Sequence, residues 1–113
     1  MLTIENLRAW GANTDEALRR CMNNEAFYLG LVSRAMQDDS IGKLKEAVEA
    51  GDLERGFELA HALKGTMGNL ALTPICTPVQ EITELLRART QADYAPLLSE
   101  IIAQRDKLIG LLR

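Results

Sequence analysis

The sequence predicts an all-α fold: an antiparallel up-down four-helix bundle with short additional helices at the N-terminus. In several long segments the apolar residues recur at three- and four-residue steps, which is the period of an amphipathic helix. Runs of alternating apolar and polar residues are essentially absent, and no proline lies in a hairpin-like turn. Four amphipathic helices with short connections bury their apolar stripes most simply in an up-down bundle.

The composition predicts one compact domain over residues 1–113. The chain is 47% hydrophobic, which is enough for one core. Its net charge of -3 argues against nucleic acid and anionic membrane surfaces as partners. No segment resembles a signal peptide or a membrane-spanning helix, and Cys21 and Cys76 are expected to be free thiols in a reducing compartment. We therefore expect a cytoplasmic monomer.

Two short helices are expected near the N-terminus, within about residues 1–23. The first ends at Gly11, which can adopt the left-handed conformation of a helix C-terminus. Asn13 or Thr14 can cap the second helix. Both helices are expected to pack across one end or one side of the bundle, with Trp10 buried against it.

The bundle itself is expected to span about residues 24–112. Gly51-Asp52 is typical of a helix stop followed by an N-cap, and Thr73-Pro74 of a capping side chain followed by a proline in the first turn. Pro78 lies just beyond that turn and should bend the helix or shift its start. The bundle helices are expected at residues 25–50, with a break near 38–40, and at 52–71, 74–89 and 92–111.

The helix expected at 52–71 carries His61, the only histidine of the chain. The apolar stripe of this helix consists of Leu53, Phe57, Ala60, Leu63, Met67 and Leu70. At about 100° per residue, His61 falls outside the centre of that stripe, on a flank that can reach solvent. Gly65 and Gly68 lie further along the same flank, although an interior helix glycine costs about 1 kcal/mol relative to alanine. These glycines predict a surface stripped of side chains beside the imidazole, and Lys64 adds a positive charge within reach.

This combination has the features of a phosphoryl acceptor, because a neutral imidazole is a nucleophile and a cation can offset phosphoryl charge. Taken alone, His61 would be an ordinary surface histidine and Lys64 a solvated lysine; their joint occurrence with the glycines favours the acceptor role. One histidine and two distant cysteines predict no metal site. The chain has no glycine-rich loop for ATP, so it is not expected to phosphorylate itself.

The run His-Ala-Leu-Lys-Gly, from His61 to Gly65, resembles the signature of the histidine-containing phosphotransfer (HPt) domain family. The resemblance implies that His61 accepts the phosphoryl group, that Lys64 assists it electrostatically and that Gly65 keeps its approach clear. The family usually has a glycine ten residues after the histidine, where this chain has Ala71. The resemblance extends weakly over nearly the whole chain, and the family fold agrees with the predicted bundle.

The resemblance also implies the partners, which are receiver domains of response regulators and hybrid histidine kinases. The receiver domain would supply the aspartyl phosphate and Mg²⁺, so no cofactor is expected on this chain. In the family, a polar residue of the facing helix often hydrogen-bonds the other ring nitrogen. Thr83 lies nearest the corresponding position, and Gln80 is the second candidate. Met67 and Cys76 follow helical spacing and are expected in the core.

Two other functions remain open on the sequence. The chain could be a helical adaptor that docks a receiver or kinase domain without accepting phosphate, although the presence of both His61 and Lys64 favours transfer. A general-base enzyme that uses His61 is disfavoured, because no second catalytic group accompanies the histidine.

Overall fold

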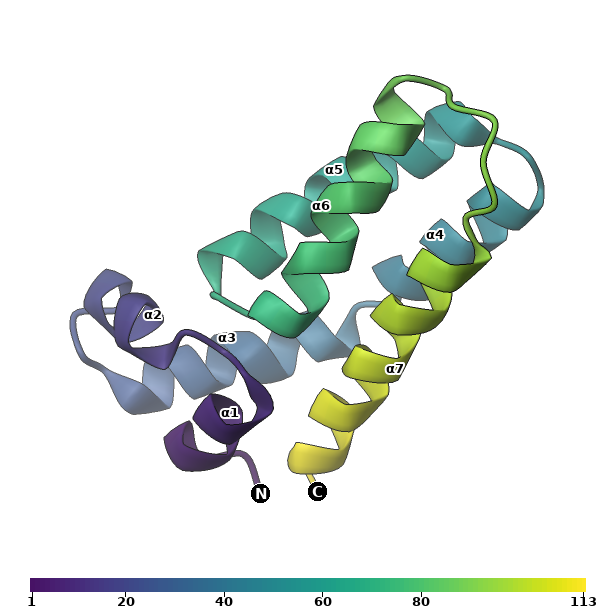
Figure 1. The fold of residues 1–113 in the computed structure, drawn as a ribbon. Coiled ribbons are helices and arrows are strands. Elements are labelled where there is room, and N and C mark those ends of the chain that lie inside the picture. Colours follow the sequence, from purple (N-terminus) through teal and green to yellow (C-terminus); the bar gives the residue numbers. More distant parts are fainter.

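A computed structural model describes residues 1–113 and is all-helical, which confirms the all-α part of the prediction (Figure 1). No helix combines the length and the hydrophobicity that a bilayer crossing requires. The seven helices are α1 Ile4–Trp10, α2 Thr14–Arg20, α3 Glu25–Gln37, α4 Ser40–Glu49, α5 Leu53–Asn69, α6 Thr73–Arg87 and α7 Ala95–Leu111.

The last four helices pack against one another in chain order. Helix α5 packs against both α4 and α6, while α7 packs on α6 and also contacts α4 (Figure 1). Helix α1 lies against α7, where the half-buried Trp10 donates its indole N–H to Oε1 of Gln104 at 3.1 Å. The two chain ends meet at this place, because the α-amino group of Met1 contacts the carbonyl of Arg113. The short N-terminal helix therefore packs on the later helices, as expected.

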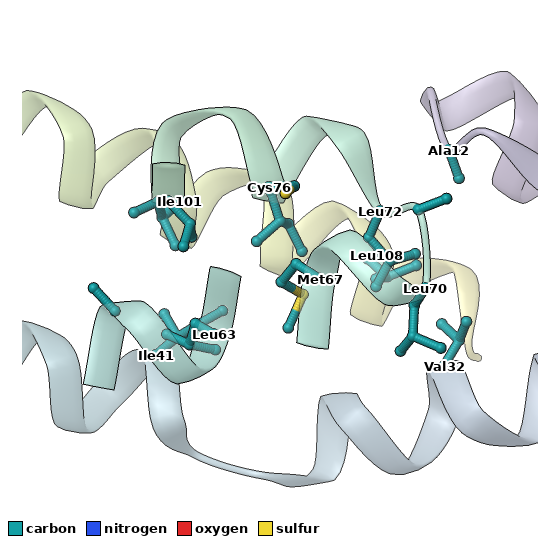
Figure 2. Packing of buried hydrophobic residues seen from close by; sticks show 14 of the residues in the cluster. Ala12, Val32, Ile41, Leu63, Met67, Leu70, Leu72, Cys76, Ile101 and Leu108 are labelled. Atoms are coloured by element: carbon teal, nitrogen blue, oxygen red, sulfur yellow. The ribbon is translucent and has the colours of Figure 1, made fainter. Parts of the chain in front are cut away.

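One apolar core joins these helices. It extends from Leu2 near the start of the chain to Leu108 near its end. Met67 and Cys76 are only 2% and 8% exposed, so their predicted place in the core is confirmed. Full burial of one large apolar side chain contributes about 1.5–3 kcal/mol. Figure 2 shows side chains of α3, α5, α6 and α7 gathered in this core, among them Val32, Leu63, Met67, Leu70, Cys76, Ile101 and Leu108.

Helix α3 is tied to the turn between α5 and α6 by a buried tyrosine. Tyr28 is fully buried and its hydroxyl donates to the carbonyl of Leu70 at 2.8 Å. Burial, with a smaller contribution from Cys21, raises the pKa of Tyr28 to about 12. The hydroxyl therefore keeps its proton, and this hydrogen bond, at neutral pH.

Local side chains cap three helix starts, of which those at Asn13 and Asp52 were predicted. Asn13, Asn24 and Asp52 each accept a hydrogen bond from the backbone N–H three residues later, at 3.3, 3.0 and 3.1 Å. Gly11 and Gly51 have φ values of +125° and +76°, which glycine adopts at little cost. This confirms the predicted helix end at Gly11, the cap at Asn13, and the helix stop and N-cap at Gly51-Asp52.

Two helix starts differ from the prediction. Helix α6 begins at Thr73 with Leu72 as its N-cap, so Thr73 is inside the helix and is not its cap. Pro78 does not displace that start; it lies within α6 and is buried among the core residues of the helix. Helix α7 begins at Ala95, three residues later than expected, because the Asp93 carboxylate accepts the Ala95 N–H at 3.0 Å and starts the helix there.

Candidate functional site

His61 lies near the middle of α5, and its side chain is exposed. Ala60 and Leu63, which are near His61 in the helix but belong to the apolar stripe, are 0% and 5% exposed. The helix thus buries one face while the imidazole stands at the surface, as the offset of His61 from the stripe predicted.

The imidazole is covered on one side by Phe57, one turn earlier in α5. The two ring centroids are 5.5 Å apart with an interplanar angle of 16°, so the rings are stacked. The guanidinium of Arg87, from α6, lies 5.0 Å from the centre of the Phe57 ring. Nε of Arg87 is in turn 3.1 Å from a carboxylate oxygen of Glu84. The ring that covers His61 is therefore itself held by α6.

The other side of His61 is open. No atom lies within 4 Å of the position that a Cβ would take on Gly65, and a Cβ on Gly68 would meet only Sγ of Cys76 at 3.8 Å. Beside these glycines is a hollow of about 340 Å³ that contains no apolar and no acidic residue in its lining. Its lining residues are Arg20, His61, Lys64, Gly65, Gly68, Asn69 and Gln80.

Lys64 is the cation nearest to His61 along the helix. Its side chain is 35% exposed, and its Nζ lies 3.8 Å from Oε1 of Glu84. A partly exposed ion pair at this distance contributes less than about 1 kcal/mol, so an anion in the hollow can compete for the ammonium group. Burial raises the pKa of the Cys76 thiol and the charge of Lys64 opposes that shift. The thiol therefore keeps its proton at neutral pH and is a poor nucleophile.

The structure separates the two residues that were expected to orient the imidazole. Thr83 is fully buried and donates its hydroxyl to the carbonyl of Val79 at 2.6 Å, so it faces the core and does not line the hollow. This corrects the expectation for Thr83, whose hydroxyl bonds to its own helix. Gln80, one turn earlier in α6, is exposed and lines the hollow with His61, although it makes no hydrogen bond to the ring.

Two features of the site were not predicted. Arg20 reaches the hollow from α2, and its Nη1 donates to the carbonyls of Gly68 and Asn69 at 2.9 and 3.0 Å. Nothing in the local sequence distinguishes it from its exposed neighbour Arg19. Phe57 was assigned only to the apolar stripe; its i, i+4 spacing from His61 was the signal that it could also touch the ring.

A larger hollow of about 640 Å³ lies between α4 and α7, away from His61. Its lining mixes charged residues with apolar ones, among them Val48, Leu98 and Ile102. It has no histidine or cysteine, and no group of three or more His, Cys, Asp or Glu side chains anywhere in the chain could hold a metal ion. The smaller hollow, by contrast, has the His61 imidazole in its lining.

The all-helical fold, the exposed imidazole, the nearby cation and the bare glycines are the features expected of a histidine phosphotransfer domain. The model of the Hpt domain family matches residues 32–111, and the chain belongs to this family. No match was found among curated proteins or among solved structures. Hpt domains carry phosphoryl groups in two-component phosphorelays without being kinases, and they interact with receiver domains and histidine kinases.

Proposed function

We propose that His61 takes a phosphoryl group from the aspartyl phosphate of a receiver domain and passes it to a second receiver domain. The observation that carries this proposal is the open side of the exposed imidazole. There Lys64, Gly65 and Gly68 border a hollow without apolar or acidic lining residues. A polar, cationic hollow beside a nucleophilic nitrogen suits the charge of a phosphoryl group.

In the proposed step, the unprotonated ring nitrogen of His61 attacks phosphorus in line. The P–N bond forms as the bond from phosphorus to the aspartyl oxygen breaks, and the carboxylate leaves with the electron pair. The proton on the other ring nitrogen stays there, so the product is a phosphorylated imidazolium that can transfer the group onward by the reverse chemistry. Catalysis of this kind depends on positioning and charge neutralisation.

Each residue of the open side has a distinct role in this proposal. Lys64 offsets charge on the phosphoryl oxygens, and its weak pairing with Glu84 leaves it able to do so. Gly65 and Gly68 admit the loops of the partner's active site. Gln80 of α6, which lines the hollow, would hydrogen-bond the imidazole or the phosphoryl group. Mg²⁺ belongs to the receiver domain, and this chain needs no cofactor of its own.

We further propose that the interrupted helix α3–α4 forms an antiparallel up-down four-helix bundle with α5, α6 and α7, within one domain of residues 1–113. The packing of α5 between α4 and α6, and of α7 on α6, supports this arrangement. The one core that extends from Leu2 to Leu108 supports the single domain. Such a protein would work as a monomeric cytoplasmic carrier.

The test is label transfer from a panel of radiolabelled, phosphorylated receiver domains to the full chain. Wild type should gain phosphate that is labile in acid and stable in alkali, and His61→Gln should gain none while keeping the same circular-dichroism spectrum. Binding of a receiver domain without any label on wild type would instead identify a phosphorylation-independent adaptor. Equal labelling of His61→Gln would remove His61 as the acceptor.

A further inference from the structure

Arg20 brings a second cation to the hollow from outside the acceptor helix. Its Nη1 uses both hydrogens on the carbonyls of Gly68 and Asn69, and its Nη2 contacts the carboxylate of Glu16. A guanidinium has five N–H donors. The Nε–H and one Nη2 hydrogen of Arg20 therefore remain without a protein partner, on a side chain that is 45% exposed at the hollow.

The position of Arg20 is set by the fold. Four consecutive carbonyls at the C-terminal end of α5 accept hydrogen bonds from residues 13–28. Gly68 and Asn69 accept from Arg20, Leu70 accepts from the Tyr28 hydroxyl at 2.8 Å, and Ala71 accepts from the Asn13 N–H at 2.9 Å. Helix ends leave such carbonyls unpaired unless other groups reach them. The N-terminal segment thus closes the end of the acceptor helix and fixes α2 against it.

The charges around the hollow favour an anion. Its two cationic side chains, Arg20 and Lys64, come from α2 and α5. The acidic groups that face them, Glu16 and Glu84, pair with these cations but do not line the hollow. Helix α2 also lies before the segment that matches the family, residues 32–111. Arg20 therefore lies outside the matched segment.

We propose that Arg20 is a second phosphoryl-binding residue of the His61 site, supplied by the N-terminal segment. This inference rests on the proposed function. The free donors of the guanidinium form hydrogen bonds to oxygens of the phosphoryl group once it is on His61. The bonds to Gly68 and Asn69 hold the guanidinium in place. Guanidinium groups suit this task because their planar donors match phosphoryl oxygens.

The experiment measures how phosphate distributes at equilibrium between a phosphorylated receiver domain and the full chain, well below the melting temperature of each variant. Arg20→Gln should shift the distribution toward the receiver by about tenfold, as expected for a lost charge-assisted bond. Arg20→Lys keeps the charge but loses the planar donors of the guanidinium, so it should shift the phosphate distribution less. The control Arg19→Gln, at the exposed neighbouring position, should match wild type.

A merely structural role would lower the melting temperature of Arg20→Gln and leave the distribution unchanged. Wild-type distributions in both Arg20 variants, with wild type well labelled, would overturn this inference alone. If Arg20→Gln fails to fold, a wild-type distribution in Arg20→Lys would be enough to overturn this inference. A wild-type chain that acquires no label from any receiver domain would overturn the proposed function and this inference together.

Discussion

The two sides of the His61 imidazole are built in opposite ways. Toward the start of α5, Phe57 stacks on the ring and Arg87 of α6 covers Phe57. Toward the end of the helix, Gly65 and Gly68 present bare backbone beside a polar hollow. One side therefore restrains the ring, and the other leaves room in front of it.

The two sides contribute free energies of opposite sign. An aromatic pair contributes about 0.5–1.5 kcal/mol beyond the area that it buries, which is enough to favour one orientation of an exposed ring. Each interior glycine costs α5 about 1 kcal/mol relative to alanine. That cost is large beside a typical domain stability of about 5–15 kcal/mol. The open side is thus destabilising for the helix, and access to His61 is a reason for it.

Filling the open side should have the largest effect. Gly65→Gln places a side chain where no atom now lies within 4 Å, so it should obstruct the receiver domain and slow phosphotransfer by about a hundredfold. The matched control is Gly30→Gln in α3, where the space around the glycine is equally empty. Transfer from a labelled receiver domain measures both. A Gly65→Gln variant as fast as Gly30→Gln would show that clearance at Gly65 has no role.

Removing the cation of the open side should have the next largest effect. Lys64→Ala loses one charge-assisted contact to the phosphoryl group but keeps the nucleophile, so transfer should slow by about tenfold without stopping. The 35% exposure of Lys64 limits the effect. Lys107→Ala, an exposed position on α7, serves as the control in the same kinetic assay. Equal rates for the two variants would make Lys64 an ordinary surface residue.

Loosening the packed side should have a smaller effect on rate. Phe57→Leu keeps an apolar side chain but removes the stacked ring, so transfer should fall by a few-fold at most. In proton NMR spectra, the ring protons of His61 should lose the ring-current shift that Phe57 imposes. Phe27→Leu, at an exposed aromatic on α3, should change neither quantity. An unchanged His61 spectrum in Phe57→Leu would contradict the stacking.

The smallest expected effect is on the free energy of unfolding. It can be measured by comparing two glycines of one helix. Gly65→Ala should raise the free energy of unfolding by about 1 kcal/mol, because the new methyl meets nothing. Gly56→Ala should gain less, since its Cβ would lie 3.3 Å from Cγ2 of Val48 and 3.5 Å from Leu86 in the core. Urea unfolding of both variants decides the point. A larger gain at Gly56 would reverse the assignment of the open and packed faces.

Features of α5 that depend on local sequence could be predicted. The Asp52 cap, the apolar stripe and the flank that carries His61 all follow from spacing within the helix, and the structure has each of them. Lys64, Gly65 and Gly68 share that flank for the same reason. They therefore line one hollow with His61.

Features that depend on how helices meet could not be predicted. Arg20 lies far from His61 in the chain, and only the packing of α2 on the end of α5 brings it to the hollow. The choice of Gln80 over Thr83 likewise depends on the rotation of α6 about its axis. Ala71 takes a φ of +56°, a left-handed conformation that favours glycine, while its carbonyl accepts the Asn13 N–H. Tertiary contacts therefore hold an alanine where the family usually has a glycine.

The central claim is that phosphate enters on the open side of His61 while Phe57 keeps its place on the packed side. The direct measurement is NMR of the isotope-labelled chain before and after transfer from a phosphorylated receiver domain. A phosphohistidine signal at His61 is expected, with the largest amide shifts at Lys64, Gly65 and Gly68 and a persistent Phe57–His61 ring contact. Phosphate on any other residue, or loss of the Phe57–His61 contact on phosphorylation, would contradict it.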